Sequence, residues 1–237
     1  MSAPAGVFVS FEGGDGAGKS TQVRLLGEWC AALGREVVLT REPGGTTLGL
    51  TLREAVLHGD HVDARTEALL YATDRAHHVA SLVRPALERG AVVITDRYLD
   101  SSVAYQGSGR DLGAEEVERL SLWAVDGLLP HVTVLLDVDP EVGRGRLTDA
   151  PDRLESAGEE FHRRTRAAFL ERAAAEPGRW LVVDASAAVE EVADRVRAGV
   201  VERTGLGADA AEGTGTGVGT GVGTGVGTGV GTPSEPV

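Results

Sequence analysis

Apolar residues along the chain follow two alternating patterns. Five short runs are almost continuously apolar and are bounded by glycine, proline or polar residues. Such runs predict strands of a parallel sheet with both faces covered; they span residues 6–11, 36–40, 91–95, 132–138 and 179–184. Between these runs, apolar residues recur at helical spacing. This spacing predicts helices from residue 18 onward, over residues 48–57, 64–89, 114–128, 158–176 and 189–202, and a short one from Pro140.

The regular alternation of strands and helices indicates the fold class. We predict an α/β protein with a three-layer architecture, in which a five-stranded parallel sheet is flanked by helices. In the longest expected helix, residues 64–89, the side chains of Tyr71, Asp74 and Arg75 fall within one turn of each other. His77 and His78 follow them, and we expect both on the exposed surface of that helix.

The composition changes near the end of the chain. The protein has 237 residues, and between Gly213 and Thr232 it repeats Gly-Thr-Gly-Val with no charged or aromatic residue. Such a segment buries too little apolar surface to offset its ordering entropy. We therefore predict a folded domain over residues 1–204 and a flexible tail over residues 205–237.

Charge and cysteine content exclude several classes of protein. The formal net charge is −13, so binding to nucleic acid without sequence preference is not expected. Cys30 is the single cysteine, which excludes an intramolecular disulfide. The first apolar stretch is too short to cross a bilayer and no basic residues precede it. We expect no signal peptide, no contact with a membrane, and a cytoplasmic location.

A glycine-rich loop between the first strand and the first helix carries the clearest chemistry. Its sequence is Gly, four residues, Gly, Lys and Ser, in the order strand, loop, helix. Its backbone N–H groups and the start of the helix are suited to an anion such as a triphosphate. The alternative is a turn that only caps the helix. We predict nucleotide binding by Gly13, Gly14, Asp15, Gly16, Ala17, Gly18, Lys19, Ser20 and Thr21.

Lys19 and Ser20 have separate expected roles within this loop. Lys19 is the only lysine among 23 basic residues, and its compact charge can reach the β- and γ-phosphates. The Ser20 hydroxyl can ligate Mg²⁺. Asp96 follows a buried strand and is a candidate for the same ion, although it could instead cap the next helix. A nucleoside triphosphate and Mg²⁺ are therefore expected at this loop.

Two further polar segments could complete a site. Residues 41–47 form a loop at the carboxyl end of the second strand, where ligands bind in open α/β sheets, although a plain Pro-Gly turn is the alternative. Residues 144–157 are rich in arginine and broken by glycine and proline. We predict that they form a mobile lid over the nucleotide, the alternative being a solvated loop. The glycine-rich loop, the Mg²⁺ candidates and the arginine-rich segment together indicate phosphoryl transfer from a nucleoside triphosphate. They do not identify the acceptor.

The order of several motifs resembles one family. The chain is similar to bacterial thymidylate kinase over about residues 6–200, and the segment from Asp96 to Gly107 is the most specific. The resemblance is carried by residues 11–21, 41–46, 71–75, 96–107 and 152–155. It implies a nucleoside monophosphate kinase domain of the P-loop NTPase type, the reaction of ATP and dTMP to ADP and dTDP, and a homodimer.

The resemblance also implies roles for individual residues at the acceptor. Asp15 would face the sugar 3′-hydroxyl and Arg97 would hold the dTMP phosphate. Arg75 would donate to a thymine carbonyl, Tyr71 would stack on the base, and Tyr105 would crowd the 2′ position. The full set implied to contact dTMP is Asp15, Tyr71, Arg75, Arg97, Ser102, Tyr105 and Gln106.

The catalytic arginine is implied to come from the lid. The loop has Gly16 and Ala17 where an arginine would otherwise stand, which resembles the bacterial subtype with a lid arginine. Arg153 is the first candidate and Arg146 the second. Lys19, Asp15, Arg153 and Arg146 are thus the implied catalytic residues.

Two other functions are weighed against this one. A nucleoside kinase would need a base to accept the proton of the substrate hydroxyl, for which Glu12 or Asp96 could serve. A GTPase-like switch or a nucleotide-sensing module is the second alternative. The Asn-Lys-x-Asp motif that reads guanine is impossible here, because the chain has no second lysine.

Overall fold

The fold is built on one parallel sheet. The computed structural model describes residues 5–147 and 153–207. Within those ranges the strands pair in the order β2-β3-β1-β4-β5, and every pairing is parallel. Their bounds are β1 Val7–Glu12, β2 Val37–Arg41, β3 Val92–Asp96, β4 Val132–Asp137 and β5 Trp180–Asp184. The predicted five-stranded parallel sheet is confirmed.

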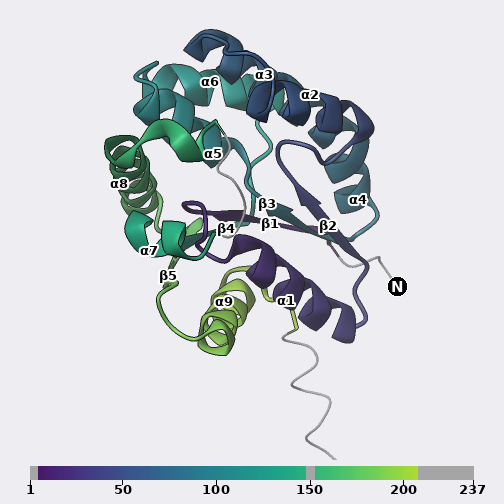
Figure 1. The fold of residues 1–237 in the computed structure, drawn as a ribbon. Coiled ribbons are helices and arrows are strands. Elements are labelled where there is room, and N and C mark those ends of the chain that lie inside the picture. The colour runs from purple at the N-terminus through teal and green to yellow at the C-terminus, as the bar shows by residue number, and fades with distance from the viewer. Residues whose placement is uncertain (1–4, 148–152, 208–237) are drawn as a thin grey trace, which may run out of the picture.

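Helices cover both faces of the sheet (Figure 1). Helices α1 and α9 lie on one face and contact each other, while α4, α5 and α6 lie on the other. The helix bounds are α1 Lys19–Ala32, α2 Thr47–Leu57, α3 Ala64–His78, α4 Arg84–Glu88, α5 Leu99–Ser102, α6 Ala114–Ala124, α7 Pro140–Gly145, α8 Glu159–Ala175 and α9 Val189–Thr204. The three-layer α/β fold is therefore confirmed.

The side chains of β1 point alternately to the two faces of the sheet, and both faces are apolar. Val9 and Phe11 are fully buried in the cluster that includes Leu26 of α1 and Val196 of α9. Phe8, which points to the opposite face, is fully buried in a second cluster with Tyr98. Successive strand residues face opposite sides of a sheet, so a strand covered by helices on both sides needs a continuous apolar run.

Three segments differ from the predicted elements. The helix predicted over residues 114–128 ends earlier, as α6 at Ala124, and Asp126 and Gly127 beyond it adopt positive φ. Residues 64–89 remain helical, but Val79–Val83 form a π-helical turn before α4. Pro85 lacks an N–H group and cannot continue the normal ladder of hydrogen bonds there. The polar segment after Asp96, which was not assigned to an element, is also helical: α5 leads into a π-helical turn over Val103–Gly109.

The folded part extends beyond the predicted boundary at residue 204. Leu206 is 3% exposed and packs in the same cluster as α1 and α9. Gly205 adopts a left-handed conformation that ends α9 and turns the chain back toward this cluster. The Gly-Thr-Gly-Val repeat lies outside the described residues, as do residues 148–152 of the expected lid.

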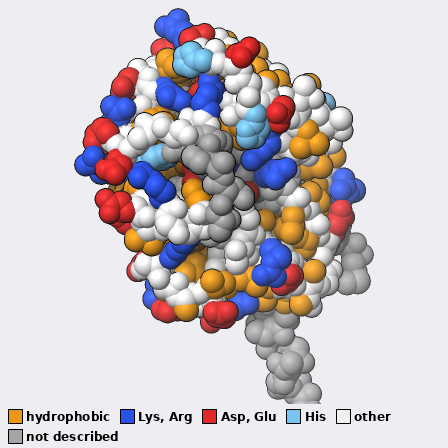
Figure 2. Space-filling view, in the orientation of Figure 1, with side chains coloured by type: hydrophobic (Ala, Val, Ile, Leu, Met, Phe, Trp, Pro, Cys, Tyr) orange, Lys and Arg blue, Asp and Glu red, His pale blue; other side chains and the backbone are white. Residues whose placement is uncertain are grey.

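On the face shown in Figure 2, acidic and basic side chains are interspersed and do not gather into one basic patch. Among the helices described, none is long and apolar enough to cross a membrane.

Candidate active site

A cavity of about 760 Å³ opens at the carboxyl ends of β1, β2 and β3. It is lined by the phosphate-binding loop, the loop after β2, and residues of α2, α3, α5 and the π-helical turn over Val103–Gly109. Most of the predicted site residues meet there: Asp15, Gly16, Ala17, Gly18, Lys19, Ser20, Thr21, Tyr71, Arg75, Asp96, Arg97, Ser102, Tyr105, Gln106 and Arg146. Gly13 and Gly14 line an adjoining cavity of about 530 Å³, which also contains Asp15 and Tyr105.

The phosphate-binding loop depends on its glycines. Gly13, Gly16 and Gly18 have φ of 131°, 73° and 94°, which side chains rarely tolerate. A Cβ atom added at Gly13 would lie 2.5 Å from the Leu136 carbonyl oxygen. The loop can therefore pass close to β4 and turn its backbone toward the cavity, as anion binding requires.

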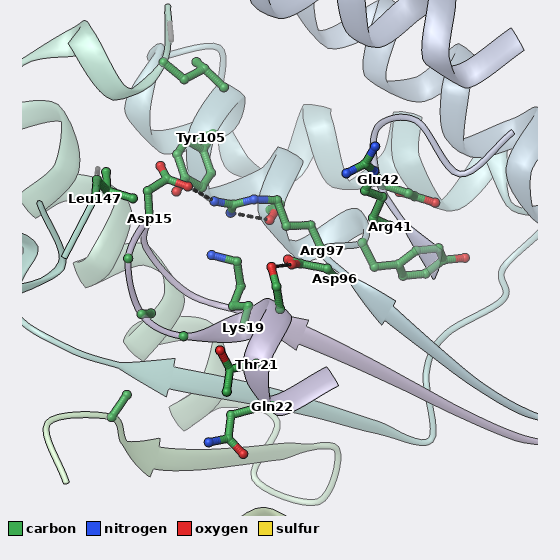
Figure 3. Close-up of a pocket in the computed structure, with 18 of the residues that line it drawn as sticks. Asp15, Lys19, Thr21, Gln22, Arg41, Glu42, Asp96, Arg97, Tyr105 and Leu147 are labelled. Atoms are coloured by element: carbon green, nitrogen blue, oxygen red, sulfur yellow. Dashed lines mark hydrogen bonds and ion pairs between the residues drawn. The ribbon is translucent and has the colours of Figure 1, made fainter. Parts of the chain in front are cut away.

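Lys19 folds back over this loop. Its Nζ donates hydrogen bonds to the carbonyl oxygens of Gly13 and Gly14, at 3.1 and 2.8 Å. Burial and the nearby charge of Arg97 lower the pKa of the Lys19 ammonium. Figure 3 shows its amine pointing into the space that Asp15 and Arg97 also face. The single lysine thus lies where a phosphate bound by the loop would be reached.

Ser20 and Asp96 form the expected oxygen pair. The Ser20 hydroxyl donates to Asp96 Oδ2 at 2.8 Å, joining the start of α1 to the end of β3. Hydroxyl and carboxylate oxygens are ligands that Mg²⁺ accepts, and this ion takes its other ligands from phosphates and water. No cluster of three or more acidic, histidine or cysteine residues that could hold a metal occurs in the described ranges. The pair therefore fits Mg²⁺ carried by a nucleotide better than a metal caged by protein alone.

Arg97 is held in an unusual backbone conformation. Its φ is 68°, in the left-handed region that non-glycine residues seldom adopt. The Arg97 N–H donates to the Phe11 carbonyl at 2.9 Å, and the Thr95 hydroxyl donates to the Arg97 carbonyl at 2.9 Å. The guanidinium pairs with Asp15 and lies 5.0 Å from the centre of the Tyr105 ring. These contacts stabilise the strained backbone of Arg97 and direct its guanidinium toward the phosphate-binding loop.

Glu12, at the end of β1, is fully buried against the segment that follows β3. Its carboxylate accepts from the Tyr98 N–H at 2.8 Å and from the Ser101 hydroxyl at 2.5 Å. Burial and the nearby Asp100 raise the pKa of Glu12 to about 8, against the opposing effects of Ser101 and Arg97. Glu12 is not among the residues that line the cavity. This position argues against Glu12 as a base that would act on a nucleoside hydroxyl.

The predicted base-binding residues lie together on one wall. Arg75 is 1% exposed but borders the cavity beside Ser102, to whose hydroxyl its Nη2 donates at 3.0 Å. The same Nη2 donates to the Tyr98 carbonyl at 3.3 Å, and Nη1 donates to the Ser121 hydroxyl at 3.3 Å. Tyr71 borders the same cavity one turn before Arg75. The tertiary structure thus brings together side chains that the sequence separates.

The prediction for His78 is wrong. His77 is exposed, but His78 is fully buried, with Nδ1 2.8 Å from Glu42 Oε1 and Nε2 2.7 Å from the Thr40 hydroxyl. His78 lies three residues after Arg75 and therefore shares its helix face. That spacing was the signal available in the sequence. Only the fold shows that the loop after β2 covers this face.

The two candidate lid arginines have different surroundings. Arg146 Nη1 donates to the Ala185 carbonyl at 3.1 Å and lies 3.5 Å from the Gly16 carbonyl oxygen, so it adjoins the phosphate-binding loop. Arg153 does not line the cavity and instead donates to Glu67 Oε2 at 2.8 Å. Glu67, which is 1% exposed, also accepts from Gln106 at 2.9 Å.

Two arginines of the cavity had no predicted role, although Arg41 belongs to the loop over residues 41–47 that we expect at this edge of the sheet. Arg41 ends β2 and is the register partner of Asp96 in β3. Arg53 of α2 donates to the Pro43 carbonyl at 3.1 Å. The position of Arg41 follows from its place at the end of a strand, whereas Arg53 reaches the cavity because α2 packs against α3.

Comparison with known proteins agrees with this geometry. A family model described as thymidylate kinase matches residues 11–196. The thymidylate kinase of Leifsonia xyli subsp. xyli is 62% identical over 205 residues, covering 83% of this chain and 97% of that protein. The thymidylate kinase of Clavibacter sepedonicus is 59% identical, with 86% and 99% covered.

The fold gives the same result. A solved structure of thymidylate kinase from Ehrlichia chaffeensis superposes with a TM-score of 0.70 at 31% sequence identity, covering 83% of this chain and 99% of that one. The family model begins near the end of β1 and spans the phosphate-binding loop and the other four strands. The chain therefore belongs to the thymidylate kinase family.

Proposed function

We propose that this protein transfers the γ-phosphate of ATP to dTMP and forms ADP and dTDP. The observation that carries the proposal is one cavity that joins the phosphate-binding loop to the side chains predicted to contact dTMP. Lys19, Arg97 and Arg75 all line this cavity. Family membership supports the same reaction.

The donor nucleotide is proposed to bind at the loop. Backbone N–H groups of residues 13–21 and the Lys19 ammonium would hold the β- and γ-phosphates. Ser20 and Asp96 would hold Mg²⁺, which when bound offsets negative charge on those phosphates. The hydrogen bond between Ser20 and Asp96 supports this assignment, because it places both oxygens at one point beside the loop.

The acceptor is proposed to bind along the opposite wall. Arg97 would hold the dTMP phosphate, and the Asp15 carboxylate would accept a hydrogen bond from the 3′-hydroxyl. Burial opposes the ionisation of Asp15, but the charges of Arg97 and Lys19 hold its pKa below the usual value. Asp15 therefore stays an acceptor at neutral pH.

Five further side chains are proposed to recognise the base and sugar. Tyr71 would stack on thymine, and Arg75 would donate to a thymine carbonyl beside Ser102. Tyr105 would crowd the 2′ position and disfavour ribonucleotides. Gln106, buried beside Tyr105, would complete this wall.

No general base is required on this proposal. The acceptor is already a phosphate anion, so the barrier comes largely from bringing two anions together. Arginines offset this repulsion, and we assign the transition-state charge first to Arg153 and second to Arg146. Arg153 would have to exchange its Glu67 partner for phosphate, whereas Arg146 already adjoins the loop.

We also propose a homodimer in the cytoplasm, where ATP is supplied. Helices α3 and α6 contact each other and expose Leu69 and Trp123, which are 54% and 82% exposed. Apolar side chains of this size on adjacent helices favour a protein partner. Light scattering during gel filtration should give twice the chain mass, and Trp123→Glu should reduce it.

Substrate choice tests the reaction. ADP release should be measured with ATP and each of dTMP, dUMP, UMP and thymidine as acceptor. We expect the highest kcat/KM with dTMP and no comparable turnover with thymidine. A preference for thymidine would support the nucleoside kinase alternative, and the absence of a dTMP preference would contradict the proposal.

A further inference from the structure

We propose that His78 is a positioning residue for base recognition, which fixes Glu42 so that Glu42 can orient Arg75 toward the cavity. His78 itself does not line the cavity. Any effect of His78 on the substrate must therefore pass through its neighbours. The inference rests on the proposed contact between Arg75 and a thymine carbonyl.

A continuous chain of contacts links His78 to the base-binding wall. His78 Nδ1 lies 2.8 Å from Glu42 Oε1, and Arg75 Nε donates to the other oxygen, Oε2, at 2.7 Å. Glu42 is 3% exposed and Arg75 is 1% exposed. Arg75 then presents its outer nitrogen to Ser102 at the cavity edge. Each link is protected from water, which strengthens a charged hydrogen bond.

The partners of His78 define which ring nitrogen carries hydrogen. A carboxylate paired with an arginine can only accept, so the hydrogen bond to Glu42 requires a proton on Nδ1. Nε2 then faces the Thr40 hydroxyl at 2.7 Å. Both ring nitrogens are thereby occupied, and the ring has one orientation that satisfies them.

The surrounding loop leaves the ring no space to turn. A Cβ atom added at Gly45 would lie 2.7 Å from His78 Nε2 and 2.6 Å from the Thr40 hydroxyl. The loop after β2 therefore packs directly on this contact. A ring held on one side by the loop and on the other by α3 is suited to fixing the position of a carboxylate.

Glu42 is the link that needs such support. It comes from the loop, whereas Arg75 and His78 come from α3, so the carboxylate is clamped between two side chains of one helix. Loss of the clamp would leave Arg75 with weaker partners, the hydroxyls of Ser102 and Ser121 and one carbonyl. Small displacements of a binding group reduce substrate affinity strongly.

Two isosteric variants separate this role from simple packing. In His78→Asn the side-chain amide can replace Nδ1 as donor to Glu42, whereas in His78→Gln it replaces Nε2 and loses that contact. We expect His78→Gln to raise the KM for dTMP roughly tenfold, with the KM for ATP within about twofold. His78→Asn should restore most of the dTMP affinity. His77→Asn and His77→Gln, on the exposed neighbour, are the matched controls.

Arg75→Lys provides the second measurement. It should raise the KM for dTMP, and adding His78→Gln to it should cause little further change, because both act through one guanidinium. If Arg75→Lys raises this KM but His78→Gln does not, the inference is overturned. Equal effects of His78→Asn and His78→Gln would also overturn it.

Two other outcomes are an Arg75→Lys variant with unchanged KM for dTMP and a His78→Gln variant that does not fold. If Arg75→Lys leaves the KM for dTMP unchanged, the proposed Arg75 contact fails, and the positioning role fails with it, while the kinase reaction stands. If His78→Gln does not fold, Thr40→Val removes only the partner of Nε2 and serves instead. It should raise the KM for dTMP in the same direction, and no rise would overturn the inference.

Discussion

The Arg97 guanidinium and the Asp15 carboxylate form an ion pair that joins the end of β3 to the phosphate-binding loop. Arg97 also donates to Ser101 at 3.2 Å and to the Gly13 carbonyl at 3.2 Å. The proposed acceptor site is thus already assembled around a positive charge. A phosphate arriving there would meet a guanidinium whose orientation is set by its backbone and by Asp15.

Arg97→Lys should damage the use of dTMP more than the use of ATP. Lysine keeps the charge but loses the fork that binds two phosphate oxygens, so we expect the KM for dTMP to rise about 10- to 100-fold. Steady-state kinetics with each substrate varied in turn measures this. Arg24→Ala, at an exposed pair on α1, is the control. Unchanged dTMP saturation would count against the phosphate contact.

Lys19 should be irreplaceable by arginine. Lys19 Nζ donates to two carbonyls of the loop as a compact charge, whereas a planar guanidinium presents its donors in a different geometry. We expect Lys19→Arg and Lys19→Met both to lower kcat by about 10²-fold or more, since each loses the point charge on the transferred phosphate. Activity of Lys19→Arg close to that of the original protein would refute the assigned role.

The two lid candidates can be separated by their kinetics. Arg153→Ala should lower kcat by up to about 10³-fold and change the KM for dTMP little, because a catalytic arginine acts on transition-state charge. Arg146→Ala should have a smaller effect on kcat. Arg163→Ala, at an exposed position of α8, is the control. The reverse order of effects would assign the catalytic charge to Arg146.

The buried carboxyl of Asp74 should make stability depend on pH. Burial and the nearby Glu42 raise the pKa of Asp74 from 3.8 to about 6, and its Oδ2 has no hydrogen-bond partner among the described residues. Because the folded state binds this proton more tightly than the unfolded state, the stabilisation from Asp74 is complete below about pH 4 and is lost as pH rises through 6.

Asp74→Asn should remove this dependence. Asparagine keeps an acceptor for the Gly44 N–H, which lies 3.2 Å from Asp74 Oδ1. We expect the variant to gain on the order of 2 kcal/mol of unfolding free energy relative to the original protein at pH 7.5, and little at pH 4. Urea denaturation across this range measures it, with Asp60→Asn at an exposed position as control. A constant difference between pH 4 and 7.5 would contradict the prediction.

Two truncations should define the end of the folded domain. Removing residues 208–237 should leave activity and stability unchanged if the tail is a passive extension. Removing residues 206–237 also deletes Leu206, which is buried beside α1 and α9, and should lower the free energy of unfolding by about 1–3 kcal/mol. Thermal denaturation of both truncated proteins measures the difference. Equal stability of the two would show that Leu206 contributes nothing.

Much of the fold was predictable because its signals are local. The apolar run before Gly13 and the helical spacing after Lys19 predict a strand, a loop and a helix without knowledge of the rest of the chain. Asp96 could be placed at the site because parallel strands end at one edge of the sheet. Its contact with Ser20 follows from that rule, although the two are 76 residues apart.

Other features depend on how one helix packs against a distant loop. The exposed position expected for His78 is wrong because the phase of α3 and the path of residues 41–46 together bury that face. The pairing of Arg153 with Glu67 has the same origin, since 86 residues separate them. No local pattern encodes such pairs.

The sequence by itself determined the sheet, the phosphate-binding loop and the single lysine within it, because strand runs, glycine spacing and residue chemistry act over a few neighbouring positions. The tertiary structure alone decided that Glu42 is clamped between His78 and Arg75, and that Arg97 adopts φ of 68° toward Asp15. These relationships arise only when separate elements pack together, because burial and long-range hydrogen bonds then select one arrangement among many that are locally possible.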